Sequence, residues 1–248
     1  LHAAWQGYPG RQLKVIGVTG TDGKTTTVRL VTEILQAAGH AVGRIDTVGA
    51  SIAGQELDTG FHTTTPDAPE LQSYLARMAR ERMEYAILET TSHGLAQHRV
   101  AGSEYDVAVV TNITHEHLDY HGSYEAYREA KAMLFRSLNT AYHKPGVRKT
   151  AVINADDSSY DYLLAIPAET RLVYGIRNTA ALDVQPWAVY GRLMLASPAG
   201  LQMEARVRRS YPSEEWILPL RSPLIGRYNA HNILAAVAAA LSQGVGAE

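Results

Sequence analysis

The chain has 248 residues, 46% of them hydrophobic, which is enough for one large domain with a full core or one domain with a small appendage. A net charge of −2 does not favour nucleic-acid binding, and the absence of cysteine excludes disulfides and thiolate metal sites. No apolar run reaches the ~18 residues of a membrane span. The first residues lack a signal-peptide pattern, so we expect a cytoplasmic protein in which residues 1–12 are a connector.

Buried strands and helices are predicted to alternate from residue 13 onward. The apolar runs predict strands over 13–19, 42–46, 85–90, 106–112, 150–157 with its turn, and 171–175. Apolar residues that recur about every 3.6 positions predict three helices, over 24–38, from the Asp67 region to 81, and over 124–138. The middle helix is expected to begin at a capping box made by Asp67 and Glu70. This alternation predicts a doubly wound, mostly parallel sheet.

The pattern changes after residue 180. Short alternating runs broken by Pro and Gly predict antiparallel hairpins over about 180–220, either as a subdomain or as an extension of the sheet. Residues 229–243 form a last predicted helix, and residues 244–248 resemble the start of a linker. The expected fold class is therefore α/β, with one domain over 13–243 and a small antiparallel β extension.

A phosphate-binding loop is predicted within "VIGVTGTDGKTTTVRLV", residues 15–31. Gly20 and Gly23 let the backbone amides approach phosphate, and the following helix adds partial positive charge. Lys24 can reach the β- and γ-phosphates, and the Thr25 hydroxyl can ligate Mg²⁺. The strict Walker pattern is not met, because Val18 occupies its first glycine position. The alternative is a chance glycine turn, but the strand–loop–helix context favours ATP or GTP.

An acidic residue follows another buried strand in "ILETTSHG". Ligands of open α/β sheets lie at the carboxyl ends of the strands, so Glu89 is placed to bind Mg²⁺ beside the phosphates. The alternative is a surface carboxylate with no ligand.

Histidines are concentrated in one segment, at positions 93, 98, 115, 117 and 121. This concentration indicates a polar site. The zinc motif H-E-x-x-H is absent, and although His117 and His121 could share a helix face, a third ligand is not evident. For any one of these histidines, a hydrogen-bonding role is at least as well supported as ligation.

Lys131 lies on an apolar helix face together with Tyr124, Tyr127, Leu134 and Leu138. Burial favours the neutral amine of a lysine, which is a nucleophile, for example toward CO₂. Spacing alone favours the other reading, in which the side chain extends to water.

Five motifs together resemble the Mur ligase family: "GVTGTDGKTT", "HTTTPD", "LETTSHGLAQHRV", "TNITHEHLDYHGSYEAYREAK" and "GRYNAHNILAAVAAAL". They are most similar to the members that add the third residue of the peptidoglycan stem peptide. The resemblance implies that ATP phosphorylates the carboxylate of UDP-MurNAc-L-Ala-D-Glu. The amine of an amino acid then attacks the acyl-phosphate, which yields an amide and phosphate.

The resemblance also implies roles for individual residues. ATP is expected at Gly20, Thr21, Asp22, Gly23, Lys24, Thr25 and Thr26, with Asn229 and Asn232 near the adenine. One Mg²⁺ is expected at Thr25 and Glu89, and a second ion at His117, supported by a carbamylated Lys131. The expected catalytic residues are Lys24, Glu89, His117 and Lys131. The UDP-MurNAc-peptide is expected at Thr64, Thr65, Thr91, Ser92 and Arg99. On this basis carbamylation explains Lys131 better than extension to water.

This sequence departs from the family in several ways. Asp22 stands where many members have Asn, which adds a negative charge beside the phosphates, and Thr91 stands where relatives often have Ser. The family's N- and C-terminal domains, which hold the uridine nucleotide and select the amino acid, are expected to be absent. The chain alone is then expected to bind nucleotide but to ligate poorly.

Three other functions remain open. They are a folylpolyglutamate- or cyanophycin-type ligase, a non-catalytic nucleotide-binding module that acts through a partner, and a P-loop kinase. The motifs "HLDYHG" and "SHGLAQHRV" count against the first, and the retained Lys24, Glu89, His117 and Lys131 count against the second. The kinase gives no reason for Lys131 or for the Asn229–Asn232 motif. No nucleic-acid or membrane partner is expected.

Overall fold

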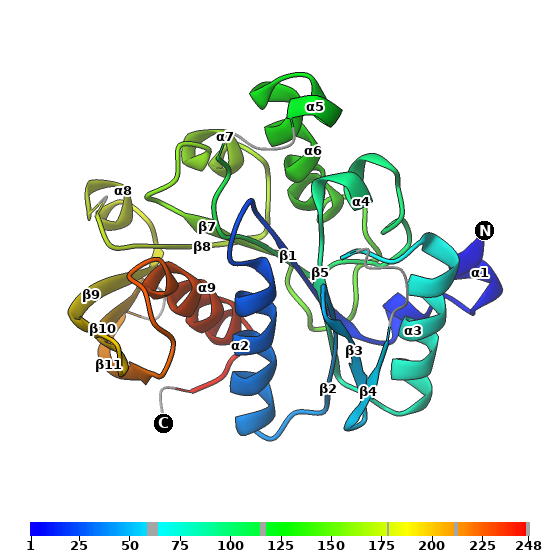
Figure 1. The fold of residues 1–248 in the computed structure, drawn as a ribbon, viewed down its shortest axis with the longest axis horizontal. Helices are drawn as coiled ribbons and strands as arrows, with labels where there is room; N and C mark the ends of the chain where they lie inside the picture. Colours follow the sequence, from blue (N-terminus) through cyan, green and yellow to red (C-terminus); the bar gives the residue numbers. More distant parts are fainter. Residues whose placement is uncertain (59–63, 115–117, 178, 211–212, 247–248) are drawn as a thin grey trace.

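The strands form one continuous mixed sheet (Figure 1). The computed structural model describes residues 1–58, 64–114, 118–177, 179–210 and 213–246. Among them the sheet has eleven strands in the order β11-β10-β9-β8-β7-β6-β1-β5-β2-β3-β4. The order reverses around β1, which lies between β5 and β6, so the fold is doubly wound, as predicted.

The central part of the sheet is parallel. It consists of β2 (Val42–Asp46), β5 (Tyr85–Glu89), β1 (Lys14–Thr19), β6 (Val107–Val110), β7 (Thr150–Asn154), β8 (Thr170–Gly175) and β9 (Trp187–Ser197). Nearly every residue of β1, β5, β6 and β7 is buried, because helices cover both faces of these strands. The strands predicted up to residue 175 are confirmed, although several end one to three residues earlier than expected.

Antiparallel strands extend the sheet at both sides. The predicted hairpins are β9, β10 (Gly200–Arg209) and β11 (Glu214–Ser222), and they continue the main sheet because β9 pairs in parallel with β8. On the other side, β3 (Gly49–Ile52) and β4 (Gln55–Leu57) form a hairpin that was not predicted. Its turn places Ala53 and Gly54 at φ 51° and 78°, and alanine at such a position gives no sequence signal.

Two long helices cover one face of the sheet. In Figure 1, α2 (Lys24–Ala37) and α9 (Asn229–Ser242) lie side by side in front of the strands, and both contribute to one buried cluster. Their predicted spans are confirmed to within one residue. No helix in the described part of the chain is long and apolar enough to cross a membrane.

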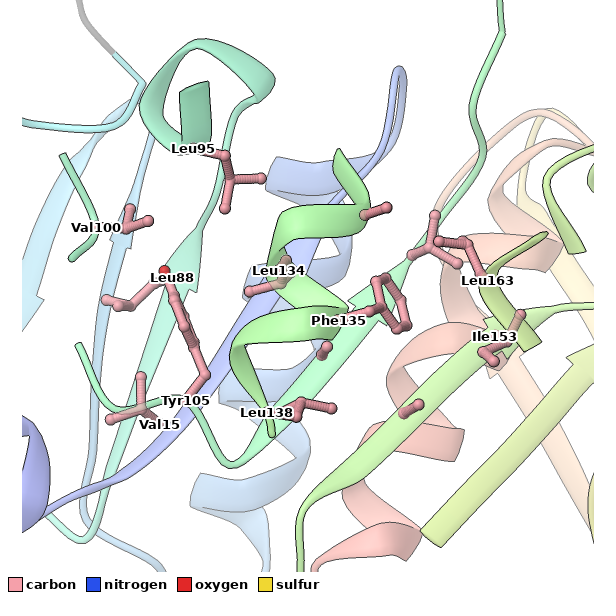
Figure 2. Packing of buried hydrophobic residues seen from close by; sticks show 14 of the residues in the cluster. Val15, Leu88, Leu95, Val100, Tyr105, Leu134, Phe135, Leu138, Ile153 and Leu163 are labelled. Carbon is pink, nitrogen blue, oxygen red and sulfur yellow. The ribbon is translucent and has the colours of Figure 1, made fainter. Parts of the chain in front are cut away.

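The other face is covered by α3 (Ala68–Arg80) and α6 (Tyr124–Ser137), together with shorter helices. The short helices are α1 (His2–Trp5), η1 (Pro9–Arg11), α4 (Ser92–Ala96), α5 (Leu118–His121), α7 (Tyr160–Leu164) and α8 (Thr179–Asp183). A second buried hydrophobic cluster lies on this face, and Figure 2 shows in it Leu134 and Phe135 of α6 and Leu138, the residue that follows the helix. Each side chain of this size contributes about 1.5–3 kcal/mol when fully buried.

Gly17 of β1 allows α6 to approach the sheet closely. A Cβ atom at Gly17 would lie 2.7 Å from both Leu134 Cδ1 and Tyr105 Cε1, so a larger residue would push the helix away. Because Lys131 is one turn before Leu134, this close contact sets the distance between Lys131 and the loop that follows β1.

The expected capping box at α3 is wrong. Asp67 is the N-cap residue, but its side chain makes no cap hydrogen bond and pairs instead with Arg99, with Oδ1 3.3 Å from Nε. Glu70 accepts a hydrogen bond from the Tyr74 hydroxyl at 3.0 Å. The helix still begins at Ala68, where Pro69 in the first turn removes one amide that would otherwise need a partner.

Candidate functional site

The loop from Gly20 to Gly23 joins β1 to α2 at the edge where the parallel strands end, called here the carboxyl edge. Both glycines have φ values in the left-handed region, at 150° and 79°. A Cβ atom at Gly20 would lie 1.8 Å from Thr111 Oγ1, and one at Gly23 would lie 2.1 Å from Asn232 Oδ1. The loop is therefore held closely between the end of β6 and the start of α9, and glycine is required at both positions.

The backbone of this loop is fixed by the residues that follow β6. Asn112 Oδ1 accepts a hydrogen bond from Asp22 N at 3.0 Å, and Asn112 Nδ2 donates to Asp22 O at 3.1 Å. Thr111 Oγ1 also donates to Asp22 O, at 2.6 Å. The Asp22 residue itself is exposed, so its carboxylate faces solvent at the loop surface.

Lys24 is the first residue of α2, and Thr25 and Thr26 follow it in the first turn. Its Nζ atom donates to Thr21 O at 2.7 Å, so the side chain folds back over the loop. Backbone amides at a helix start and a lysine above them form the arrangement that binds a phosphate chain.

Glu89 ends β5 and is only 3% exposed. Its Oε2 atom accepts hydrogen bonds from Thr25 Oγ1 at 2.8 Å and from Thr47 N at 3.0 Å. No ion pair involves Glu89 in the part of the chain that the structure describes. The Glu89 carboxylate thus lies beside a threonine hydroxyl, and both are oxygen ligands that Mg²⁺ prefers.

Lys131 is 1% exposed, so its side chain does not extend to water as its spacing alone suggested. The Nζ atom donates to Gly20 O at 2.6 Å and lies 4.4 Å from the centroid of the Tyr127 ring. Tyr127 in turn places its hydroxyl 3.2 Å from Thr21 Oγ1. The buried lysine thus contacts the phosphate loop directly.

A cavity of about 290 Å³ lies against the loop. It is lined by Lys24, Thr64, Thr65, Thr91, Ser92, His93, Arg99, Tyr127 and Lys131. The structure therefore brings together all five residues expected to bind substrate with two of the residues expected to act in catalysis. Among the described lining residues, Lys24, Arg99 and Lys131 carry cationic groups and none is Asp or Glu, so the cavity suits an anionic ligand.

Hydrogen bonds connect one wall of this cavity to β5. Thr65 Oγ1 donates to Glu89 O at 3.1 Å and lies 2.9 Å from Thr91 Oγ1. Thr91 also caps α4, because its hydroxyl accepts a hydrogen bond from Gly94 N at 3.0 Å. Arg99 Nη1 donates to Thr65 O at 3.1 Å, which directs the guanidinium toward the same wall.

Asn229 and Asn232 lie in the first turn of α9, and both are buried. Asn232 Nδ2 donates to Asn229 Oδ1 at 2.8 Å, and Asn229 Nδ2 donates to Ile225 O at 2.8 Å. The close contact of Asn232 with Gly23 places this pair at the phosphate loop. Contact with a nucleotide base stays a prediction.

His117, expected at a second metal ion, and His115 lie outside the described residues. Within the described ranges, no group of three His, Asp or Glu side chains could hold a metal ion. The rings of His93 and His121 are 5.5 Å apart between centroids, and the His93 ring lies 4.2 Å from that of Tyr120.

Several residues of the site were not predicted. Thr47 binds Glu89 through its amide, Asn112 holds the loop, and His93 and Tyr127 line the cavity. Thr47 and Asn112 each follow a parallel strand, so their positions at the carboxyl edge were an available signal. His93 belongs to the histidine concentration that indicated a polar site, although no role was assigned to it, and helix packing decides which way Tyr127 faces.

Comparison with known proteins finds similarity across almost the whole chain. Residues 18–240 match the model of the Mur ligase middle domain. The UDP-N-acetylmuramyl-tripeptide synthetase of Roseiflexus sp. strain RS-1 is 40% identical over 255 residues, which cover 99% of this chain and 47% of that protein. The chain thus spans about half the length of the curated relatives it matches.

Two solved structures are also similar. A UDP-N-acetylmuramoyl-L-alanyl-D-glutamate–2,6-diaminopimelate ligase has a TM-score of 0.77 and 32% identity, covering 95% of this chain and 44% of that one. Folylpolyglutamate synthase of Mycobacterium tuberculosis, complexed with ADP, has a TM-score of 0.71 and 20% identity. The match covers 98% of this chain and 57% of that one. The second likeness concerns the fold alone.

Proposed function

The chain belongs to the Mur ligase family, and on this basis we propose that it is the ATP-binding central part of a ligase that adds the third amino acid to UDP-MurNAc-L-Ala-D-Glu. The reaction would form an amide bond through an acyl-phosphate. The relatives above 30% identity are named as ligases for that step, whereas the folylpolyglutamate synthase is 20% identical. This difference favours the peptidoglycan substrate over a folate.

The observation that carries the proposal is the cavity shared by the phosphate loop and the predicted substrate residues. Lys24 and Lys131 line it together with Arg99, and Thr65 and Thr91 line the same space. A terminal phosphate on the loop would thus lie beside a second anion, the acceptor carboxylate. Bringing two like-charged reactants together needs fixed positive charge, which Lys24 and Arg99 supply.

The chemistry needs the following events. An oxygen of the acceptor carboxylate attacks the γ-phosphorus of ATP, and the bond to ADP breaks. The amine nitrogen of the amino acid then attacks the carbonyl carbon, phosphate leaves, and the nitrogen loses a proton. Lys24 would hold the phosphates and Arg99 would orient the acceptor. The glycine loop would bind the phosphates through its amides and keep water from the transferred group.

The residues present fit a magnesium ion. The Thr25 hydroxyl and the Glu89 carboxylate converge at 2.8 Å, and both are hard oxygen ligands. When bound, the ion would offset negative charge on the phosphates. We propose that Thr25 and Glu89 hold it, and that His117 and a carbamylated Lys131 support a second ion.

We also propose that residues 13–243 are one unit of a larger ligase, preceded by a connector at 1–12 and followed by a linker from 244. Relatives about twice as long contain further sequence that would hold the uridine nucleotide and select the amino acid. The present chain alone would then bind nucleotide and ligate poorly, and robust amide formation by it would contradict this.

The first experiment titrates a non-hydrolysable ATP analogue with Mg²⁺ into the chain by calorimetry, with and without UDP-MurNAc-dipeptide. We expect saturable binding that Lys24→Ala abolishes and that dipeptide strengthens, because both ligands meet in one cavity. Arg221→Gln, which changes an exposed cation on β11, serves as the charge control. Absence of binding by the unaltered chain would contradict the proposal.

Lys131 carbamylation has its own test. Chain kept in ¹³C-bicarbonate should show a carbamate signal by NMR that Lys131→Ala removes. In a full-length relative, the equivalent replacement should abolish ligation and be partly rescued by short carboxylic acids. A kinase or a passive module would show no such rescue.

A further inference from the structure

A second basic cavity lies at the edge where the parallel strands begin, called here the amino edge. Its volume is about 280 Å³. Lys14, Thr150, Thr170 and Trp187, which line it, are the first residues of β1, β7, β8 and β9. Because these strands are parallel, the cavity is at the opposite end of the sheet from the phosphate loop. Figure 1 shows α9 ending on the same side, near the C-terminus.

The charge around this cavity is strongly unbalanced. Lys14, Arg148 and Arg209 line it, and no Asp or Glu does among the residues that the structure describes. In the described ranges none of these three cations forms an ion pair. Lys14 Nζ donates to the Tyr85 hydroxyl at 3.1 Å, which leaves its charge uncompensated.

The nearby carboxylates are already occupied. Glu169 accepts hydrogen bonds from Lys149 N at 2.9 Å and pairs with His143, and Glu84 pairs with His40. Asp106, also at the amino edge, is matched by two lysines. These carboxylates therefore have partners other than Lys14, Arg148 and Arg209, and none of them forms an ion pair with those three cations in the described ranges.

The end of α9 gives an alternative explanation, because Leu241, Ser242, Gln243 and Gly244 also line the cavity. Cations are commonly found at the negative end of a helix dipole. That end carries only about half an elementary charge, however, and three cations exceed it. The carbonyl of Leu241 is also satisfied already, by Gly244 N at 3.0 Å. A large surplus of positive charge remains.

Trp187 provides a separate observation. Its ring lies 4.9 Å from the Arg209 guanidinium carbon, which holds that side chain at the wall of the cavity. Its indole nitrogen Nε1 is buried and has no hydrogen-bond acceptor in the described part of the chain. Buried donors normally have an acceptor, and those without one call for an explanation.

We propose that this amino-edge cavity is a binding site for a small phosphate-bearing anion, held by Lys14, Arg148 and Arg209. The volume lies just below the range of about 300–1,000 Å³ typical of drug-sized ligands, so a single phosphate or a short phosphate ester fits better than a nucleotide. Arginine and lysine side chains with hydroxyl and amide donors around them are the groups that recognise phosphate. The site is independent of the proposed ligase activity.

Binding is tested by the ³¹P linewidth of inorganic phosphate during titration with the chain. Lys24→Ala is used as the background, because the phosphate loop would otherwise contribute. We expect saturable broadening in this background and at least a tenfold weaker affinity when Arg148→Gln and Arg209→Gln are added. The matched control adds Arg192→Gln and Arg221→Gln, two exposed cations on β9 and β11, and should change the affinity less than twofold.

The outcomes separate clearly. No broadening in the Lys24→Ala background, equal loss in the control pair, or sulfate binding as tight as phosphate would each overturn the site. If the double variant does not fold, Arg148→Gln alone is used, since Arg148 is exposed, and at least a threefold loss is expected. Glycerol phosphate binding more tightly than inorganic phosphate would assign the natural ligand to the esters, and the reverse order would assign it to free phosphate.

Discussion

Asp106 and Glu89 are buried carboxylates at opposite edges of the parallel sheet, and their hydrogen-bond donors differ in charge. At the amino edge, Asp106 is 0% exposed and pairs with Lys144 and with Lys149, whose Nζ lies 2.9 Å from Oδ1. At the carboxyl edge, Glu89 accepts hydrogen bonds only from neutral donors in the described ranges. The two lysines beside Asp106 offset its charge, whereas Glu89 has no ion-pair partner in the described ranges.

The pairing at Asp106 also ties distant segments together. Its Oδ2 atom accepts a hydrogen bond from Val15 N at 2.8 Å, which joins the start of β6 to β1. Burial lowers the pKa of the Lys144 ammonium, although the charge of Asp106 opposes this shift. Such a cluster is sensitive to the loss of either partner, because the remaining charge stays buried.

The largest effect is expected from Asp106→Asn. Two buried lysines would lose their counter-charge, so the free energy of unfolding should fall by about 3–5 kcal/mol. Urea unfolding measures it, with Asp161→Asn on an exposed surface as control. A loss below about 1 kcal/mol would show that the cluster contributes little.

Asp46, at the end of β2, should show the next largest effect. Burial raises the pKa of this carboxyl, but hydrogen bonds from Arg29 and from Val48 N outweigh it and hold the pKa below its usual 3.8. The resulting stabilisation is complete above pH about 4 and is lost as the pH falls through the folded pKa. Asp46→Asn should cost about 2–3 kcal/mol at pH 7 and flatten the acid limb of the stability–pH curve. An unchanged acid limb would contradict this.

Glu89→Gln should change stability far less. The replacement keeps an acceptor for Thr25 and Thr47 and removes a buried charge that has no ion-pair partner in the described ranges, so we expect a shift within about 1 kcal/mol. The expected loss is in function: Mg²⁺ should no longer strengthen binding of the ATP analogue. Retained Mg²⁺ dependence in calorimetry would remove Glu89 from the metal site.

The smallest effect is expected from Asp67→Asn. Its ion pair with Arg99 involves a side chain that is 76% exposed, so solvent screens it, and the cost should be less than about 0.5 kcal/mol. Thermal unfolding measures it. A larger loss would mean that Arg99 depends on Asp67 for its position, and binding of UDP-MurNAc-dipeptide should then weaken as well.

Much of the fold could be predicted because its signals are local. Strands buried on both faces are apolar along most of their length, and the runs that became β1, β5, β6 and β7 are. The phosphate loop could be recognised for a similar reason, since its glycines, lysine and threonine are adjacent in sequence. The β3–β4 hairpin was missed because its turn uses Ala53, a residue that rarely adopts a positive φ.

Tertiary structure decided what sequence spacing left open. Lys131 is amphipathic, and its position in an apolar stripe is compatible both with burial and with extension to water. Because α6 packs closely on β1 at Gly17, the Lys131 side chain is buried and its Nζ donates a hydrogen bond to Gly20 O. In the same way, Asp67 had the spacing of a cap, yet Arg99, from a segment 32 residues later in the numbering, took its carboxylate.

The sequence by itself therefore determined the strand–helix alternation and the glycine loop, because each depends on neighbours in the chain. Only the folded chain decided which charges are paired and which are left for ligands. That choice depends on distances between residues far apart in sequence, as between Thr25 and Glu89 or between Asp106 and Lys149. The physical reason is that the cost of a buried charge is set by the partners within a few ångströms of it, and packing supplies those partners.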